Sequence, residues 1–196
     1  AGISLSDNRD FEDIAFRGAA RDTVFLSEEG VPEVREYSLA SGTLVGTIPR
    51  PSIFGNRRAN LGFESLSLNR TRSRLWTANE EALSVDGGVS TTAAGTWIRL
   101  LQYDATQNPP VPLSQFAYLT QPIHGSVISG ARSGVSQVVA LPNGKLLVLE
   151  RSFAFAATFF QTRIYEVDVS AATDVSALGT LIGTSYTPAT KRPLYV

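Results

Sequence analysis

The chain has 196 residues, a formal net charge of −1 and no cysteine, and 43% of its residues are hydrophobic. The balanced charge argues against a nucleic-acid partner, because surfaces that bind phosphate backbones normally carry an excess of basic residues. Without cysteine this chain has no disulfide and no thiolate metal site. Its longest strongly apolar run, residues 153–160, is far shorter than the ~20 residues of a membrane-spanning helix.

Short segments in which apolar and polar residues alternate recur from end to end, separated by Gly, Pro, Asn and Asp. This period of two is typical of β-strands, and no stretch of a dozen residues carries the 3.6-residue period of a helix. The sequence therefore predicts an all-β fold.

The predicted strands fall into three similar units along the chain. The first three strands of the units are expected at residues 11–16, 23–29 and 34–39, at 63–68, 74–81 and 98–104, and at 135–141, 145–151 and 162–168. A weaker fourth strand is expected at 43–48, 114–119 and 179–183. Four antiparallel strands per repeat is the pattern of β-propeller blades. A β-sandwich is the alternative, but a sandwich does not require the same three-strand pattern to recur.

The units correspond to blades at about residues 8–55, 60–122 and 133–186 of a single domain spanning residues 1–196. Three blades do not close a ring, because propellers have typically ~4–8. We therefore expect a second chain or a further segment to complete the propeller.

Acidic residues recur at the same places in these units. Because the first and second strands are antiparallel, the start of the first and the end of the second lie at one end of the sheet. The residues at these places are Glu12 with Glu28-Glu29, Glu64 with Glu80-Glu81, and Ser136 with Glu150-Arg151. Ca²⁺ takes about six to eight oxygen ligands, which converging carboxylates and carbonyls can supply. The alternative is that these acids end strands, pair with arginines such as Arg35 and face solvent.

The Phe-rich run at residues 153–160 falls between the second and third predicted strands of the third unit. We expect it to form a loop that faces the core, and a loop that faces a partner is the alternative.

Several segments resemble the phytase-like family, which is described by an esterase-like activity of phytase. They are Asn60–Ser67, Ser27–Pro32, Ala78–Leu83 and Leu147–Ser152, in the family's order. The resemblance implies a six-bladed type of propeller, exported to the periplasm or secreted, with metal-dependent hydrolysis of phosphate or other esters. It also implies a further glutamate-bearing blade. Two departures bear on phosphate specificity, because Leu61 stands where arginine is usual and Ser65 where glycine is usual.

The resemblance and the repeated acids together predict a calcium-dependent phosphoesterase or esterase. The expected catalytic residues are Glu64, Glu80 and Glu150, and Arg151 is expected to bind a small phosphate or carboxylic ester substrate. The expected calcium ligands are Glu12, Glu28, Glu64, Glu80 and Glu150. The alternative is a non-catalytic propeller that binds a protein or glycan, with the acids in structural roles.

Overall fold

The computed structural model describes residues 9–18, 20 and 22–196. Over these residues the chain forms three four-stranded antiparallel sheets, and its helical content is one short 3-10 turn, Ser52–Asn56. This confirms the predicted all-β class and the predicted four strands per unit. No helix in the described part of the chain is long and apolar enough to cross a membrane.

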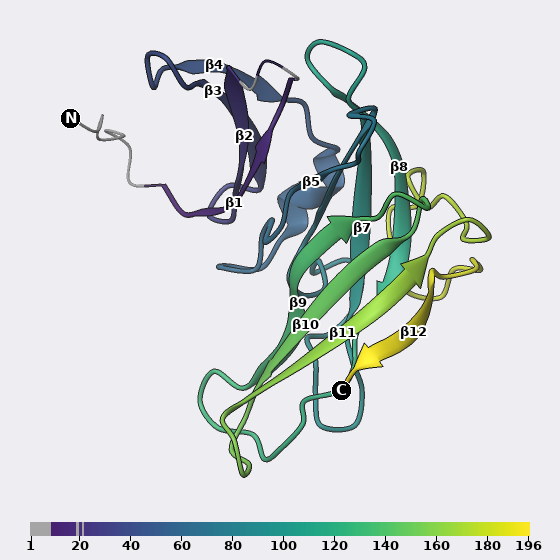
Figure 1. Cartoon of the computed structure of the whole chain (residues 1–196). Coiled ribbons are helices and arrows are strands. Elements are labelled where there is room, and N and C mark those ends of the chain that lie inside the picture. Colours follow the sequence, from purple (N-terminus) through teal and green to yellow (C-terminus); the bar gives the residue numbers. More distant parts are fainter. Residues whose placement is uncertain (1–8, 19, 21) are drawn as a thin grey trace.

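Each sheet is made of four strands that are consecutive in the sequence (Figure 1). The first sheet contains β1 (Phe11–Phe16), β2 (Thr23–Glu28), β3 (Glu33–Ser38) and β4 (Leu44–Ile48). The second contains β5 (Ser67–Leu68), β6 (Arg74–Ala78), β7 (Trp97–Asp104) and β8 (Val111–Leu119). The third contains β9 (Arg132–Ala140), β10 (Leu146–Phe153), β11 (Phe160–Asp168) and β12 (Thr190–Tyr195).

The fourth strand of the third sheet differs from the prediction. We expected it at residues 179–183, but the sheet ends instead with β12, which extends past the predicted blade end at 186. The segment before β12 packs on the second sheet, where Val175 and Leu181 are buried with Ala117. The charged residues and Pro193 of β12 hid its strand character, and proline is tolerated there because β12 is an edge strand.

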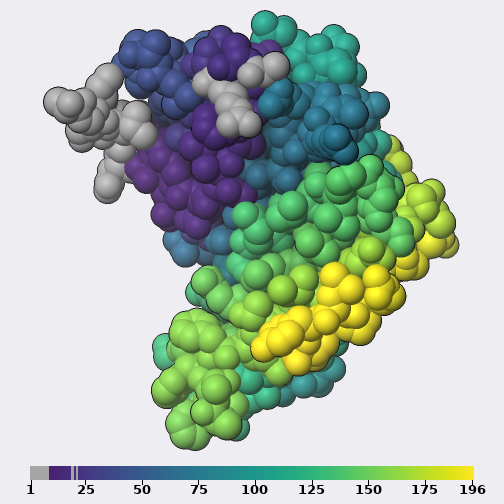
Figure 2. All heavy atoms as spheres, viewed as in Figure 1, coloured from purple at the N-terminus to yellow at the C-terminus, as the bar shows by residue number. Residues whose placement is uncertain are grey.

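The sheets stack in chain order, with buried apolar side chains between neighbours. Phe25, Phe63 and Leu75 belong to the core between the first and second sheets. Trp76 and Val148 belong to the core between the second and third. The first and third sheets accordingly occupy different parts of the molecular surface in Figure 2. The stacking brings the first strands together, since β5 contacts both β1 and β9.

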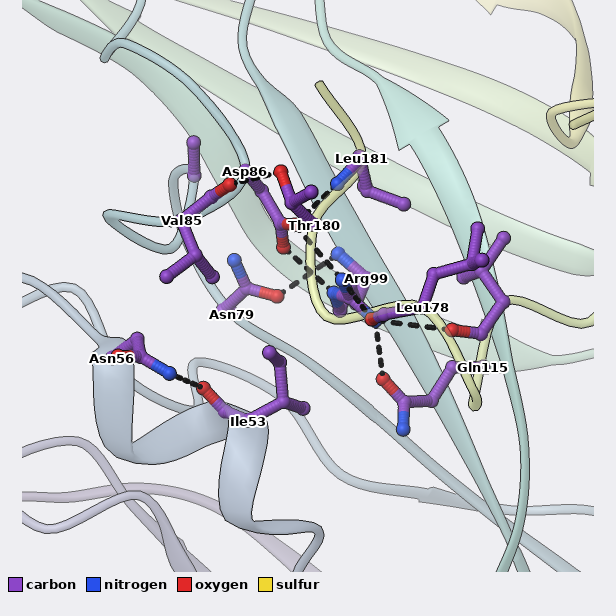
Figure 3. Close-up of polar contacts among 12 residues, drawn as sticks. Ile53, Asn56, Asn79, Val85, Asp86, Arg99, Gln115, Leu178, Thr180 and Leu181 are labelled. Carbon is purple, nitrogen blue, oxygen red and sulfur yellow. Dashed lines mark hydrogen bonds and ion pairs between the residues drawn. The ribbon is translucent and has the colours of Figure 1, made fainter. Parts of the chain in front are cut away.

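A buried ion pair braces the second sheet against the segment that precedes β12 (Figure 3). Arg99 on β7 and Asp86 have fully buried side chains, and Arg99 Nε lies 2.6 Å from Asp86 Oδ2. The guanidinium group also donates to the carbonyls of Val175 and Leu178, at 3.2 and 3.0 Å. Asp86 accepts the backbone N–H of Leu181 at 2.9 Å. One charged pair thus joins residues that are distant in the sequence.

Candidate functional site

A pocket of about 470 Å³ lies where residues from all three sheets meet. Its lining consists of Asp10, Glu12, Glu29, Asn60, Glu64, Glu80, Gly130, Arg132, Arg151, Phe153 and Phe160. Five carboxylates and two guanidinium groups are among these side chains. The lining therefore combines seven charged side chains with the aromatic rings of Phe153 and Phe160.

Strand pairing shows which acids occupy equivalent positions in the three sheets. Phe11 pairs with Glu28, Phe63 bridges to Asn79, and Val135 pairs with Glu150. The residues that follow these partners, Glu29, Glu80 and Arg151, are therefore equivalent, and all three line the pocket.

The one-residue offset between the neighbouring acids decides which of them lines the pocket. Glu28 is the last residue of β2 and Glu29 follows it in a turn, and of the two only Glu29 lines the pocket. The second-strand acids we had aligned, Glu28, Glu80 and Glu150, are not structural equivalents. Glu80 corresponds to Glu29 in the first sheet and to Arg151 in the third.

Glu28 lies outside the pocket, in an ion-pair network of the first sheet. Its Oε2 atom lies 2.9 Å from Arg9 Nη1 and 3.3 Å from Arg35 Nε.

Glu150 is fully buried elsewhere, between the second and third sheets. It accepts the hydroxyl of Tyr118 at 2.5 Å and the backbone N–H of Gln121 at 2.7 Å. Its Oε1 atom also lies 2.7 Å from Lys191 Nζ. Neither Glu28 nor Glu150 is among the residues that line the pocket.

Two glycines let acids of neighbouring sheets approach one another. A Cβ atom at residue 62 would overlap the backbone oxygen of Glu29, and one at residue 134 would lie 2.7 Å from the backbone oxygen of Glu80. Glu80 O also accepts the N–H of Val135 at 3.0 Å. The loop after the second strand of each sheet therefore packs on the beginning of the next sheet, which places its acid beside those of the neighbour.

Two groups of three carboxylates share Glu29. One group contains Asp10, Glu12 and Glu29, the other Glu29, Glu64 and Glu80, and in each group a carboxylate oxygen from every residue lies within 4.8 Å of the others. Glu29 is only 2% exposed, and its Oε1 atom is buried with no hydrogen-bond partner among the described residues. A buried carboxylate oxygen without a donor is costly to keep.

Burial and mutual repulsion raise the pKa of these acids. The pKa of Glu64 rises to about 9, chiefly because burial disfavours its charged form and then because Glu80 lies nearby. The pKa of Glu80 rises to about 7 through burial, although the charge of Arg132 opposes the rise. Burial also raises the pKa of Glu12 and of Glu29. The pocket therefore binds protons or another cation more readily than an exposed set of glutamates.

A family model described as phytase-like, with the esterase-like activity of phytase, matches residues 2–195. The chain belongs to the phytase-like family. The curated proteins contain no match to it.

The residues of this phytase-like pocket fit a hard cation. All the candidate donors are oxygens, the type of ligand that Ca²⁺ prefers. Glu29, which belongs to both acidic groups, also has a buried carboxylate oxygen, Oε1, without a hydrogen-bond partner among the described residues.

The expected catalytic, substrate-binding and calcium-binding residues did not include seven of the residues that line the pocket: Asp10, Glu29, Asn60, Gly130, Arg132, Phe153 and Phe160. Asp10 precedes the first predicted strand, and Arg132 and the two phenylalanines fall at the margins of predicted strands or outside them. Asp10 could have been found from its repeat position, since Glu29 N donates to Asp10 O as Glu80 N donates to Gly62 O. No comparable sequence signal points to Arg132 in this phytase-like chain.

Proposed function

We propose that this phytase-like chain forms part of a six-bladed β-propeller that hydrolyses phosphate esters with the help of calcium. The stacking of three consecutive four-stranded sheets, with their first strands in contact, supports the propeller architecture. As for exported relatives of this kind, we place the protein in the periplasm or outside the cell, with a further segment or a second chain completing the ring.

The observation that carries the proposal is the Glu29–Glu64–Glu80 group with its unpartnered buried oxygen. We propose these three residues as calcium ligands, supplemented by Glu12 and Asp10 from the adjoining group. Glu28 and Glu150, which we had expected among the ligands, are left out because their carboxylates are held by basic side chains elsewhere.

The arginines supply the pocket with two groups that can bind an anion. Arg132 Nη1 lies 3.3 Å from Glu80 Oε2, and Arg151 is exposed and projects from the adjoining strand into the same cavity. A guanidinium group matches two oxygens of a phosphate, whereas an uncharged carboxylic ester offers it no anionic group. This favours phosphate over carboxylic esters as substrates.

Each side chain has a part in the proposed reaction. Bound calcium would lower the pKa of a water molecule and stabilise charge that develops on the phosphoryl oxygens. Arg151 and Arg132 would orient the phosphoryl group, and Glu80, whose pKa is raised to about 7, would accept the proton of the attacking water and return it to the oxygen of the leaving alcohol. We retain Glu64 and Glu80 as the proposed catalytic carboxylates.

The test is phosphate release from 4-nitrophenyl phosphate by the purified, complete propeller assembly, with calcium and with a chelator. We expect turnover that requires calcium and falls by about 10²-fold or more in Glu64→Gln and Glu80→Gln. Glu166→Gln is the matched control, because this partly buried glutamate of β11 pairs with Lys145 and Arg192 and does not line the pocket.

Full activity in the chelator would remove calcium from the proposal. If a folded sample binds calcium but releases no phosphate, the result would favour a propeller that binds a partner without catalysis.

A further inference from the structure

Four phenylalanines cluster where β10 turns into β11. Phe155, Phe159 and Phe160 are 59%, 54% and 57% exposed, so this run does not face the core as we had expected. The ring centroids of Phe153 and Phe160 lie 5.1 Å apart, and those of Phe153 and Phe159 lie 6.3 Å apart in a stacked arrangement. This hairpin, yellow-green in Figure 2, projects from the lower part of the molecule.

The rings continue the charged wall of the pocket. Phe153 on β10 pairs with Arg132 on β9 and with Phe160 on β11, so the three residues form a row across the third sheet. Arg151 lies two residues before Phe153, on the same face of β10. All four residues line the one cavity, which therefore passes from guanidinium groups to aromatic rings within neighbouring strands.

Gly130 lines the pocket beside the rings. It has a positive φ of 79°, a conformation that glycine adopts without steric cost. A Cβ at this residue would lie 3.8 Å from Phe153 Cε1, inside the pocket lining.

We propose that Phe153 and Phe160 form a subsite for the alcohol group of the ester, so that the substrates are phosphate monoesters of aryl or other flat apolar alcohols. The inference rests on the proposed phosphoesterase activity and narrows its substrate class. An aromatic leaving group beside the phosphate would stack on the exposed ring of Phe160 and the partly buried ring of Phe153.

Charge complementarity argues against a polyphosphorylated polyol as the preferred substrate. The lining offers only two arginines to the several phosphates of such a substrate, and Arg132 is already paired with Glu80. The wall next to the arginines is aromatic, so further phosphates would lose hydration there without gaining hydrogen bonds. A monoester with a single anionic group and an apolar body matches both walls.

The test compares phenyl phosphate, glycerol 3-phosphate and inositol hexakisphosphate as substrates of the full chain with calcium. We expect the lowest KM for phenyl phosphate. We expect Phe160→Ala to raise that KM about three- to tenfold, with little change in kcat or in the KM for glycerol 3-phosphate. Phe155→Ala is the matched control, because Phe155 is equally exposed on the same hairpin but does not line the pocket.

The outcomes separate this inference from the activity on which it rests. Hydrolysis with equal KM values, a preference for inositol hexakisphosphate, or the same effect from both alanine variants would overturn the aryl subsite and leave the phosphoesterase intact. If no substrate is hydrolysed, the proposed activity fails, and calorimetry with phenylphosphonate and methylphosphonate decides the subsite. Tighter binding of phenylphosphonate that Phe160→Ala abolishes would support it, whereas equal or undetectable binding would overturn it.

Discussion

Replacing Glu64 with glutamine removes a carboxyl group whose pKa burial and the nearby Glu80 raise to about 9. In the unfolded chain this group titrates near 4.5, so between these two values the folded state binds more protons than the unfolded state. The free energy of unfolding must therefore fall as the pH rises from 5 to 9. Glutamine resembles the protonated acid in shape and does not titrate, so Glu64→Gln should lose the part of this dependence that Glu64 contributes, whereas Glu80, whose pKa burial raises to about 7, keeps its own.

The size of the effect follows from the shift. At about 1.4 kcal/mol for each pKa unit, a rise from 4.5 to about 9 corresponds to about 6 kcal/mol. The side chain of Glu64 is only partly buried, and solvent screening reduces this to about 3 kcal/mol. We expect the variant and the wild-type protein to be equally stable at pH 5, and the variant to be more stable by about 3 kcal/mol at pH 9.

The assay is urea unfolding in a chelator at pH 5, 7 and 9. Glu166→Gln is the control, because hydrogen bonds from Lys145 and Arg192 hold the pKa of Glu166 below its usual value and outside this pH range. Added calcium should restore the wild-type stability at pH 9 by about 2.7 kcal/mol at one hundred times its Kd, and should stabilise Glu64→Gln less. If the free energy of unfolding depends on pH in the same way in the wild-type protein and in Glu64→Gln, the argument that the pKa of Glu64 is raised in the folded state is refuted.

Three further predictions concern packing, the buried ion pair and substrate binding. Gly62→Ala should lower the free energy of unfolding in a urea titration by about 2 to 4 kcal/mol, because the added Cβ would overlap the backbone oxygen of Glu29. Gly88→Ala is the control and should have little effect, because a Cβ there would have no atom within 4 Å. Arg99→Met should destabilise the protein by about 3 to 5 kcal/mol in urea unfolding, because it leaves a buried carboxylate without its partner; a loss below about 1 kcal/mol would contradict the structural role of the pair. Arg151→Ala should raise the KM for phosphate monoesters by about tenfold or more, whereas Arg192→Ala, exposed and outside the pocket, should leave it unchanged in steady-state assays.

The strand pattern of this chain was readable from its sequence because each strand carries its own alternation of apolar and polar residues. The ends of the strands were less readable. The first strand of the second unit, expected at 63–68, is reduced to Ser67–Leu68 with an isolated bridge at Phe63. Likewise β12 has little alternation of its own and depends on pairing with β11.

The acidic site was predictable as a region, but its membership depends on the strand register. In the first and third sheets the register shifts by one residue, between Phe11 and Asp13 and between Leu149 and Glu150. The extra residue lies on the first strand in both sheets, so the shift re-aims Glu12 and Ser136. On the second strand of the first sheet, Glu29 lines the pocket whereas Glu28 pairs with Arg9 and Arg35. The pairs Glu28-Glu29 and Glu150-Arg151 give no sign in the sequence of which residue turns inward.

The brace around Arg99 bears on how freely the repeats of this protein can be exchanged. Repeat proteins are often treated as modular, with each unit contacting only its neighbours through a common interface. Here the segment at 175–181 belongs to the third unit by sequence. Its backbone groups form hydrogen bonds with the buried Arg99–Asp86 pair of the second unit. A copy or graft of the second unit alone would carry Arg99 and Asp86 without the backbone groups that satisfy them. The smallest transferable piece is therefore the second and third units together, and recombination among relatives should preserve that pair.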